Sequence, residues 1–237
     1  MWFIGISFKE LLIGIAVRAL IIFGILPIHE YAHARAAYGL GDSTAKNSGR
    51  LTLNPMAHVD WMGALLIFLI GFGWAKPVPV NPYNFRTNKK KAGLAWVSLA
   101  GPLSNLISAV VGMLIFRLLY SFMPIITFEQ SNGFVLQYAF LWFVMINIGL
   151  AVFNLIPVPP LDGSKIFAAI LPDKFLLKVS NFMAKYRMIV MIVFIVIIYS
   201  GVLDGPLSYL ENAIFSGLYT GADKLFNLIG LTVGKIG

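Results

Sequence analysis

The chain has 237 residues, of which 59% are hydrophobic and 12% are charged, and its mean hydropathy is +0.83. Soluble domains carry about 25% charged residues, so this composition excludes an ordinary soluble domain and predicts an integral membrane protein. Because the chain contains no cysteine, disulfides, thiolate metal sites and cysteine nucleophiles are also excluded. Any bound metal ion must therefore be held by histidine and carboxylate side chains.

The formal net charge of +8 does not indicate nucleic-acid binding. The lysines and arginines lie in loops beside apolar segments rather than along one soluble face, which is typical of membrane proteins. We therefore predict the lipid bilayer, and no nucleic acid, as the partner of this charge. Residues 1–4 lack a basic start and a small-residue cleavage site, so no removable signal peptide is predicted.

Five apolar runs predict the membrane elements. Roughly 20 helical residues span a hydrocarbon core of about 30 Å, and four of the runs are long enough, whereas 59–75 is marginal. The chain is therefore predicted to be an all-α polytopic membrane protein that forms a single domain over residues 1–237. The runs occupy residues 11–28, 59–75, 94–123, 134–156 and 188–203.

The first run ends in His29-Glu30-Tyr31-Ala32-His33, which matches the H-E-x-x-H zinc motif. Positions i and i+4 share one face of a helix, so both imidazoles can bind one zinc ion while Glu30 reaches a water molecule at the metal. Chance is the alternative, because the same pattern also occurs in inert helices. The motif predicts a hydrolytic site with one zinc ion per chain.

Arg18 lies inside the first run, about three helical turns before His29, and is predicted to share the zinc-facing side. An arginine within a membrane normally faces protein or water. Arg18 is therefore a candidate for contact with substrate, and a purely structural pairing is equally open.

Residues 44–53 alternate in polarity and contain Asn47-Ser48-Gly49, a pattern that predicts a small β-hairpin. The following run, 59–75, is predicted to be a re-entrant or in-plane segment with Asp60 as its N-cap and residues 71–73 at its turn. A full crossing would place the two flanking basic loops on opposite faces of the membrane. The alternative is an ordinary spanning helix that breaks this charge rule.

Residues Pro77, Val78, Pro79 and Val80 are predicted to be extended, because their two prolines exclude helix. A strand edge beside a hydrolytic site would let an unwound peptide add itself through backbone hydrogen bonds. These four residues are therefore candidate substrate contacts, and a plain structured loop is the alternative.

The run at 94–123 carries small residues at four-residue spacing, which permits close helix contact in lipid. We expect this face to pack on the helix that carries the two histidines. Asn105 within it needs a polar partner, either on another helix or on a substrate, and the helix contact is the commoner arrangement. The face comprises Ala100, Ser104, Ser108 and Gly112, with Gly101, Asn105 and Ala109 alongside.

A catalytic zinc ion usually takes three protein ligands, so the two imidazoles need a third donor. The best donor is Asp162, beside a break where three prolines end the helix that begins near Phe134. Unpaired backbone at membrane depth is tolerated where it is buried or lines a wet cavity, and Gly163 permits close approach there. The alternatives are Asp162 as an N-cap for a helix from Ser164, and His58 as a weaker candidate ligand.

Loops rich in lysine and arginine mark the cytoplasmic side, and they lie at 35–58, 76–91 and 162–187. The turns at 124–133 and 204–211 contain acids and no basic residue, and are predicted to be external. If 59–75 does not cross, the zinc motif and Asp162 reach the same cytoplasmic leaflet. The segment after Pro206 has an amphipathic pattern and is predicted to lie at the interface.

Three motifs together resemble the site-2 protease family of intramembrane zinc metalloproteases, peptidase family M50. They are H-E-Y-A-H at 29–33, G-P-L-S-N at 101–105 and N-L-I-P-V-P-P-L-D-G at 154–163. The stretches at 49–60 and 74–82 are similar to its short prokaryotic branch. The resemblance covers roughly residues 20–170 and implies a prokaryotic cell-membrane protein without a PDZ or CBS domain.

The resemblance implies that His29, His33 and Asp162 bind zinc, that Glu30 is the general base, and that Asn154 positions the substrate or the oxyanion. It also implies a three-helix catalytic core. The helices of that core would lie at about 8–38, 92–121 and 134–161, within a catalytic region of about 8–170 that is followed by C-terminal helices at 171–237.

The function implied is hydrolysis of peptide bonds within or beside the transmembrane helices of membrane-protein substrates. A metal-binding transporter with the same His and Asp cluster is one alternative, although the sequence lacks the internal repeats common in transporters. A non-proteolytic membrane adaptor of the same fold is another. The predicted oligomeric state stays open.

Overall fold

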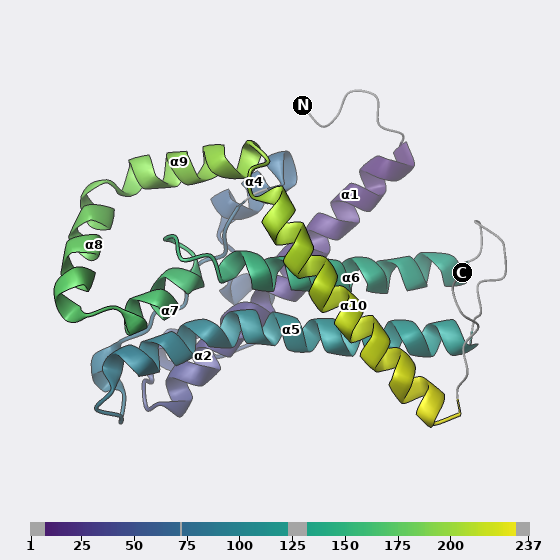
Figure 1. Cartoon of the computed structure of the whole chain (residues 1–237), viewed down its shortest axis with the longest axis horizontal. Helices are drawn as coiled ribbons and strands as arrows, with labels where there is room; N and C mark the ends of the chain where they lie inside the picture. Colours follow the sequence, from purple (N-terminus) through teal and green to yellow (C-terminus); the bar gives the residue numbers. More distant parts are fainter. Residues whose placement is uncertain (1–7, 72, 123–131, 231–237) are drawn as a thin grey trace. The chain divides into compact units, whose positions relative to one another are not determined.

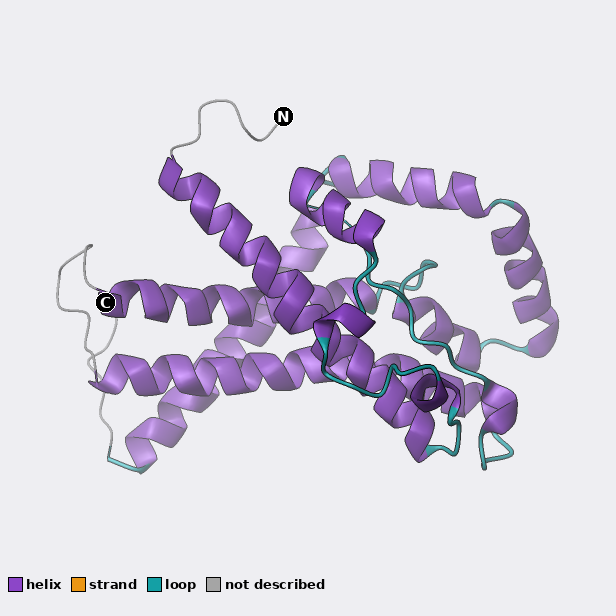
Figure 2. Cartoon of the chain, turned by 180° about the vertical axis from the view of Figure 1, so that it is seen from behind, coloured by secondary structure: helices purple, strands orange, loops and turns teal. Residues whose placement is uncertain are grey.

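The computed structural model describes residues 8–71, 73–122 and 132–230. Within these ranges the chain is helical or looped and contains no strand (Figures 1 and 2). The all-α prediction is therefore confirmed. Residues 1–4 and most of the predicted external turn at 124–133 lie outside the described residues.

Three helical stretches are long and apolar enough to cross a membrane, namely Leu12–Gly39, Lys90–Ser121 and Gln137–Asn154. They correspond to three of the five predicted runs. The run at 188–203 enters only as part of a helix pair, Ile192–Tyr199 with Asp204–Leu228, which bends by 72° and could be a broken span or a re-entrant loop. The interfacial position predicted for the C-terminal helix stays a prediction.

The described chain forms two compact units. The first is built from the chain up to Ser104 together with Leu155–Arg187, and the second from Asn105–Asn154 together with the chain after Arg187. The long helix α5 (Lys90–Phe122) contributes its first half to one unit and its second half to the other. The organisation as a single domain stays a prediction.

The first membrane helix changes its winding just before the zinc motif. It consists of α1 (Phe8–Leu20), the π-helical turn η1 (Ile21–Ile25) and α2 (Leu26–Gly39). The N–H of Leu26 bonds to the carbonyl of Ile21, five residues back. Pro27 lacks an N–H and its ring crowds the preceding α-turn, and a wider turn accommodates both. One extra residue in a turn rotates the helix face by about 100°, so residues before Ile21 lose the register of α2.

The predicted hairpin at 44–53 is wrong. Its first residues form the short helix α3 (Thr44–Asn47). Gly49 has a left-handed φ of 69°, and the N–H groups of Gly49 and Arg50 donate back to α3 at 3.0 and 2.8 Å. This pair of bonds is the Schellman arrangement that ends helices. A left-handed glycine suits a helix end and a hairpin equally, so the local pattern could not separate them.

The marginal run is a short apolar helix, α4 (Trp61–Ile70), of 10 residues. Such a helix is about 15 Å long, half the thickness of the hydrocarbon core, so it cannot cross alone. Asp60 caps it by accepting a hydrogen bond from the N–H of Gly63 at 2.9 Å, and Gly71 ends it with a φ of 77°. The predicted N-cap is confirmed, and the helix ends at the first residue of the predicted turn, of which residue 72 is not among the described residues.

Beyond α4 the chain carries no helix from residue 73 until η3 (Pro82–Asn84), as the prolines at 77 and 79 predict. This loop packs tightly on the start of α4. A Cβ atom placed on Gly63 would lie 2.0 Å from the carbonyl oxygen of Trp74, and one on Gly73 would lie 2.1 Å from that of Gly63. The backbone contact of two glycines therefore holds α4 against the loop.

Asp42 fastens the same loop to the end of α2. It is fully buried and accepts hydrogen bonds from the backbone and hydroxyl of Thr44, the N–H of Asn81 and the amide of Asn84. Burial raises the pKa of the Asp42 carboxyl, but these bonds outweigh burial and hold the pKa below its usual 3.8. Nearby, a small apolar cluster of Ala37, Phe85 and Val97 joins α2, the loop and α5.

The second unit has a core of three helices, α5, α6 (Asn132–Asn154) and α10 (Asp204–Leu228). α6 ends at Asn154 and not at 161, because Pro157 disfavours helix in the residues before it. A Cβ on Gly112 would lie 2.8 Å from Phe143 of α6, so this part of the small-residue face packs on α6 and not on the histidine helix as expected. The buried core residues are Ala109, Met113, Phe116, Val144, Ile148, Val152 and Ala222.

Arg117 is a buried cation in the second unit that the sequence analysis did not single out. Its guanidinium pairs with Asp223 and donates to the hydroxyl of Tyr219 at 3.1 Å. Charged groups at membrane depth are normally paired in this way. The contact joins α5 to α10. The remaining helices are α7 (Asp162–Ile170), α8 (Asp173–Lys185) and α9 (Arg187–Tyr199).

Candidate metal centre

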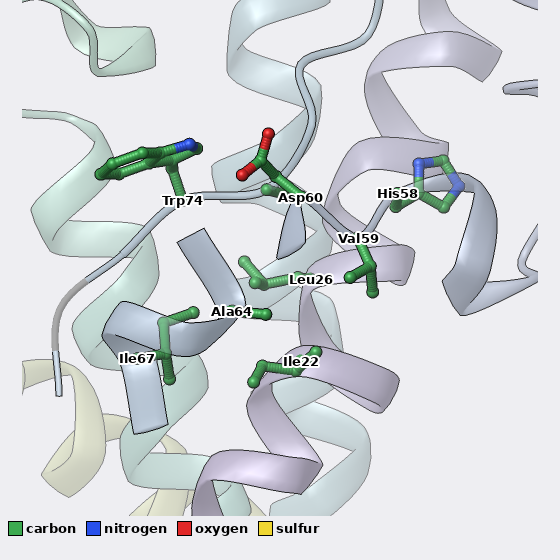
Figure 3. A pocket seen from close by; sticks show the side chains of 9 residues that line it. Ile22, Leu26, His58, Val59, Asp60, Ala64, Ile67 and Trp74 are labelled. Atoms are coloured by element: carbon green, nitrogen blue, oxygen red, sulfur yellow. The ribbon is translucent and has the colours of Figure 1, made fainter. Parts of the chain in front are cut away.

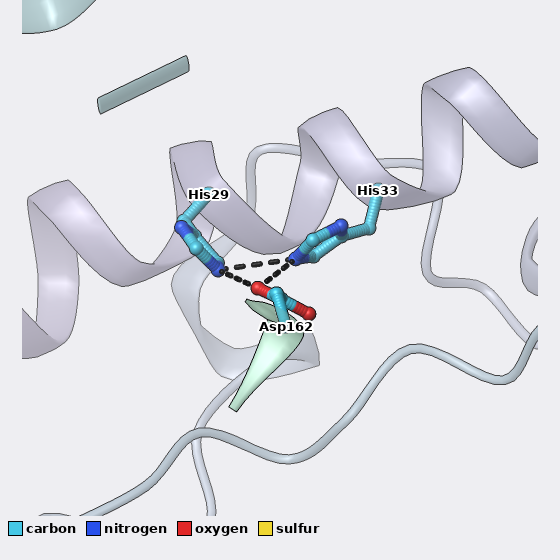
Figure 4. A group of neighbouring side chains, drawn as sticks. All are labelled: His29, His33 and Asp162. Carbon is cyan, nitrogen blue, oxygen red and sulfur yellow. Dashed lines mark hydrogen bonds and ion pairs between the residues drawn. The ribbon is translucent and has the colours of Figure 1, made fainter. Parts of the chain in front are cut away.

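Two imidazoles and one carboxylate converge in the first unit (Figure 4). His29 and His33 lie one turn apart on α2, and their Nε2 atoms are 3.0 Å apart. Oδ2 of Asp162, the first residue of α7, lies 3.2 Å from Nε2 of His29 and 3.1 Å from Nε2 of His33. All three side chains are buried. The fold therefore brings together residues that are 133 positions apart in sequence.

The three atoms fit a tetrahedral zinc site. Zinc–nitrogen and zinc–oxygen bonds are about 2.0–2.2 Å long, so two ligand atoms of a regular tetrahedron are about 3.3 Å apart, close to the spacing found here. Two imidazole nitrogens and one carboxylate oxygen are also a ligand set that catalytic zinc uses. Among the described residues, this is the sole group of three or more His, Cys, Asp or Glu that could hold a metal ion.

The hydrogen bond at Nδ1 of His33 leaves Nε2, the nitrogen near Asp162, for a metal ion. Nδ1 of His33 lies 2.7 Å from the carbonyl oxygen of Val97 in α5. A carbonyl only accepts, so Nδ1 carries the hydrogen. With the ring neutral, the Nε2 lone pair is available to a metal ion; with the ring protonated, Nε2–H donates to Asp162 instead. His58 behaves differently, because its Nε2 donates to the carbonyl of Thr52 at 2.8 Å and the ring lies outside the group.

Asp162 is held by its surroundings as well as by the imidazoles. Its carboxylate sits at the positive end of α7, and Nζ of Lys165 lies 3.6 Å from Oδ1, the oxygen turned away from the histidines. Burial raises the pKa of the Asp162 carboxyl, but hydrogen bonds to both imidazoles outweigh burial and lower it. The N-cap of α7 is Leu161, so the alternative role of Asp162 as a cap is wrong.

Gly163 lets the proline-rich loop fold over the start of α7, as the sequence predicted. A Cβ on Gly163 would lie 2.2 Å from the carbonyl oxygen of Leu155 and 2.5 Å from that of Ile156. No side chain fits in that space. The contact fixes the direction in which Asp162 leaves the loop.

The proposed general base and the proposed positioning asparagine lie on different elements. Glu30 follows His29 on α2, is half-buried, and projects about 100° round the helix from the ligand face. Asn154 is the last residue of α6 in the second unit, where its Nδ2 donates to the carbonyl of Leu150 at 2.9 Å. The roles of both residues stay predictions.

Arg18 does not keep the register that the sequence suggested. Its Nε donates to the carbonyl of Ile67 at 3.1 Å and its Nη1 to that of Gly14 at 3.0 Å. The cation therefore lies at the C-terminal end of α4, where it complements the helix dipole. The wider π turn between Arg18 and His29 accounts for the change of face, and the structural pairing is favoured over substrate contact.

The other candidate substrate contacts lie in two places. Asn105 is buried on α5 at the start of the second unit. Pro77, Val78, Pro79 and Val80 lie in the loop after α4, where Val80 packs on the cluster of Ala37, Phe85 and Val97. Part of the 77–80 loop is thus structural, and its contact with substrate stays a prediction.

A small cavity lies between the first helix and α4 (Figure 3). Its walls are mainly apolar, and Leu26 places it one turn before Glu30 on α2. The lining side chains include Ile22, Leu26, Val59, Ala64, Ile67 and Trp74. The cavity offers an apolar surface close to the predicted base.

Comparisons with known proteins agree with this chemistry. Residues 118–198, which contain Asp162 but not the H-E-x-x-H motif, match the model described as "Peptidase family M50". The chain is 44% identical to the "Putative zinc metalloprotease YwhC" of Bacillus subtilis over 145 residues, which are 61% of this chain and 64% of that protein. Over residues 118–198 the chain is similar to peptidase family M50.

Two further relatives carry a similar name. The chain is 32% identical to the "Putative zinc metalloprotease Rip2" of Mycolicibacterium smegmatis, over 58% of this chain and 51% of that protein. It is 33% identical to the protein of the same name from Mycobacterium tuberculosis, over 62% of this chain and 53% of that protein. The chain thus spans half to two thirds of the length of these relatives. No solved structure matches it significantly.

The match to the M50 model and the three candidate spans among the described residues together indicate a membrane protein. The His29, His33 and Asp162 group has the donor set for the zinc named in the relatives. The predicted packing of the small-residue face of α5 on the histidine helix is confirmed at Gly101, but sequence reasoning did not single out the contacts of α5 with the imidazole rings themselves. Gly101 and Val97 lie against the imidazoles, and the Gly-Pro pair at 101–102 inside a helix was the available signal.

Proposed function

We propose that the chain is a zinc-dependent endopeptidase of the site-2 protease type, which hydrolyses peptide bonds within or next to the transmembrane helices of other membrane proteins. The observation that carries this proposal is the triangle of two imidazole nitrogens and one carboxylate oxygen with sides of 3.0–3.2 Å. The relatives named zinc metalloproteases support the same chemistry.

In this proposal His29, His33 and Asp162 hold the zinc ion, and Glu30 is the general base. A zinc ion there would act as a Lewis acid toward the scissile carbonyl and acidify water at the site. Glu30 takes a proton from the attacking water and delivers it to the leaving amine nitrogen. Asn154 would orient the substrate or stabilise the oxyanion, as the family resemblance implies.

The substrate and the topology follow from the surroundings of the site. The histidines stand within the candidate span Leu12–Gly39, so a peptide bond reaching them lies at membrane depth or near its edge. A transmembrane helix must unwind before hydrolysis, and the 77–80 loop would pair with the unwound strand. The basic loops support a site on the cytoplasmic side of the cell membrane. α4, too short to span, would enter the membrane and return.

The transporter alternative uses the same three ligands but assigns no task to Glu30. It is not favoured, because the relatives are named metalloproteases. Zinc flux through liposomes that persists after Glu30→Gln would support it.

The test of the proposed function uses purified protein with bound zinc measured by mass spectrometry. Cleavage is followed on labelled casein in detergent and on a tagged single-span protein in liposomes. Glu30→Gln should keep one zinc ion per chain and lower both cleavage rates by about 10²–10⁴-fold, the usual contribution of a general base. Glu211→Gln, a half-buried carboxylate on α10, is the matched control and should cleave at the wild-type rate.

Two results would contradict separate parts of the proposal. Cleavage by Glu30→Gln at the wild-type rate would remove Glu30 as the base. Cleavage of casein together with an intact single-span protein would leave a zinc peptidase but reject the membrane-embedded substrate.

A further inference from the structure

α5 touches the metal centre through its backbone at two residues. A Cβ atom placed on Gly101 would lie 2.4 Å from Nε2 of His33, 2.5 Å from Cε1 of His33 and 2.6 Å from Cε1 of His29. Real Cβ contacts are rarely below 3.4 Å. Gly101 is therefore the residue that lets α5 lie directly against both imidazole rings.

One turn earlier the same helix face supplies a hydrogen bond. Residue Val97 is 2% exposed, and its carbonyl oxygen accepts from Nδ1 of His33 at 2.7 Å. Residues 97 and 101 are four apart, so they lie on one face of α5, as His29 and His33 do on α2. The two helices thus meet through two pairs of residues at matching spacing.

We propose that Val97 and Gly101 are positioning residues of the metal centre: the Val97 carbonyl fixes His33 as the Nδ1–H tautomer, and the bare backbone at Gly101 leaves the space that Nε2 and Cε1 of His33 and Cε1 of His29 occupy. This inference rests on the proposed zinc site. It assigns a task to α5 that involves none of its side chains. An imidazole whose outer N–H is hydrogen-bonded is held in one orientation with its other nitrogen free for a metal.

The first test is Gly101→Ala, compared with wild-type protein and with Gly217→Ala. A methyl group at 101 must displace both rings by about 1 Å to reach ordinary contact, whereas a Cβ at Gly217 meets nothing within 4 Å. Gly101→Ala should weaken zinc binding by about 10–100-fold, the usual effect of losing a supporting contact at a metal ligand. The visible spectrum of cobalt-substituted protein should also change, because it reports ligand geometry. Gly217→Ala should match the wild type in both.

The second test needs no variant at the contact itself. The chain has only three histidines, so the ¹⁵N spectrum of histidine-labelled protein contains three imidazoles, and His58→Asn assigns one of them. His33 should be the Nδ1–H tautomer. His58, whose Nε2 donates to Thr52, should be the opposite tautomer and serves as the internal reference.

The outcomes separate this inference from the proposed function. Wild-type protein that binds no zinc would exclude the metal site and would therefore contradict both proposals. Wild-type protein that binds one zinc ion, with Gly101→Ala equal in zinc affinity and cobalt spectrum, would overturn the positioning role alone. An Nε2–H tautomer at His33 would overturn the role of the Val97 carbonyl even if Gly101→Ala fails to fold.

Discussion

At the residue scale, two aspartates at equivalent helical positions have different surroundings. Asp162 and Asp204 are both the first residue of a helix, α7 and α10, and both gain from the positive end of the helix dipole. Only Asp162 is buried and faces two imidazoles, whereas Asp204 is exposed. The same residue type at the same helical position therefore has different neighbours, and we propose a ligand role for Asp162 alone.

Asp162→Asn should lower zinc affinity by at least about 10-fold, because a neutral amide is a much weaker zinc ligand than a carboxylate. Zinc bound at equilibrium with a competing chelator measures the change. Asp204→Asn is the matched control and should bind zinc like the wild type. Equal affinity in the two variants would exclude Asp162 as a ligand.

Glycines are likewise required for different reasons at different positions in the fold. Gly49 and Gly71 adopt left-handed φ values that a sequence pattern can anticipate, since such residues end helices. Gly101 and Gly163 have no unusual φ and are required because another segment lies where a Cβ would be. The sequence predicted close approach at Gly163 and along the small-residue face that includes Gly101, but which atoms lie there depends on the packing of distant segments.

At the element scale, the loop segments are held by hydrogen bonds from buried polar groups. Asp42 joins the end of α2 to the 81–84 segment, and Arg18 joins α1 to the end of α4. Neither residue belongs to the metal centre, and each joins a loop or a short helix to the first membrane helix or its end. The hairpin prediction failed at this scale because α3, Asp42 and the loop form one hydrogen-bonded structure that residues 44–53 alone do not specify.

Asp42→Asn should destabilise the protein by on the order of 2 kcal/mol at pH 7. The amide nitrogen of asparagine would replace a carboxylate oxygen that now accepts hydrogen bonds, and its own N–H groups would face the N–H donors. The folded pKa of Asp42 lies below 3.8, so its charge stabilises the fold above about pH 3.8 and this contribution is lost as the pH falls through the lowered folded value. Thermal unfolding of metal-free protein should show the two proteins converging below pH 3.8. A difference that is constant with pH would mean that the charge plays no part.

At the scale of the whole molecule, zinc would act as a cross-link between distant parts of the chain. His29 and Asp162 are 133 residues apart and lie on α2 and α7. A ligand that binds only the folded state stabilises it, by about 2.7 kcal/mol at a concentration 100 times its dissociation constant. The metal centre should therefore contribute to stability as well as to catalysis.

Removal of zinc by a chelator should lower the melting temperature of the detergent-solubilised protein by roughly 5–10 °C, and added zinc should restore it. His33→Ala should melt at the same temperature with and without zinc. A zinc-dependent shift that persists in this variant would place the stabilising ion elsewhere in the protein.

The sequence by itself determined the membrane class, three of the spans, the histidine pair, the N-cap of α4 and the break that frees Asp162. Each of these follows from composition, helical spacing or the backbone chemistry of Asp, Gly and Pro, which act over a few residues. Only the tertiary structure decided which atoms of α5 lie against the imidazoles, that Arg18 turns to α4, and that Arg117 pairs with Asp223. Those contacts depend on which helix faces meet and on the extra residue in the π turn, and both are set by packing between segments far apart in the chain.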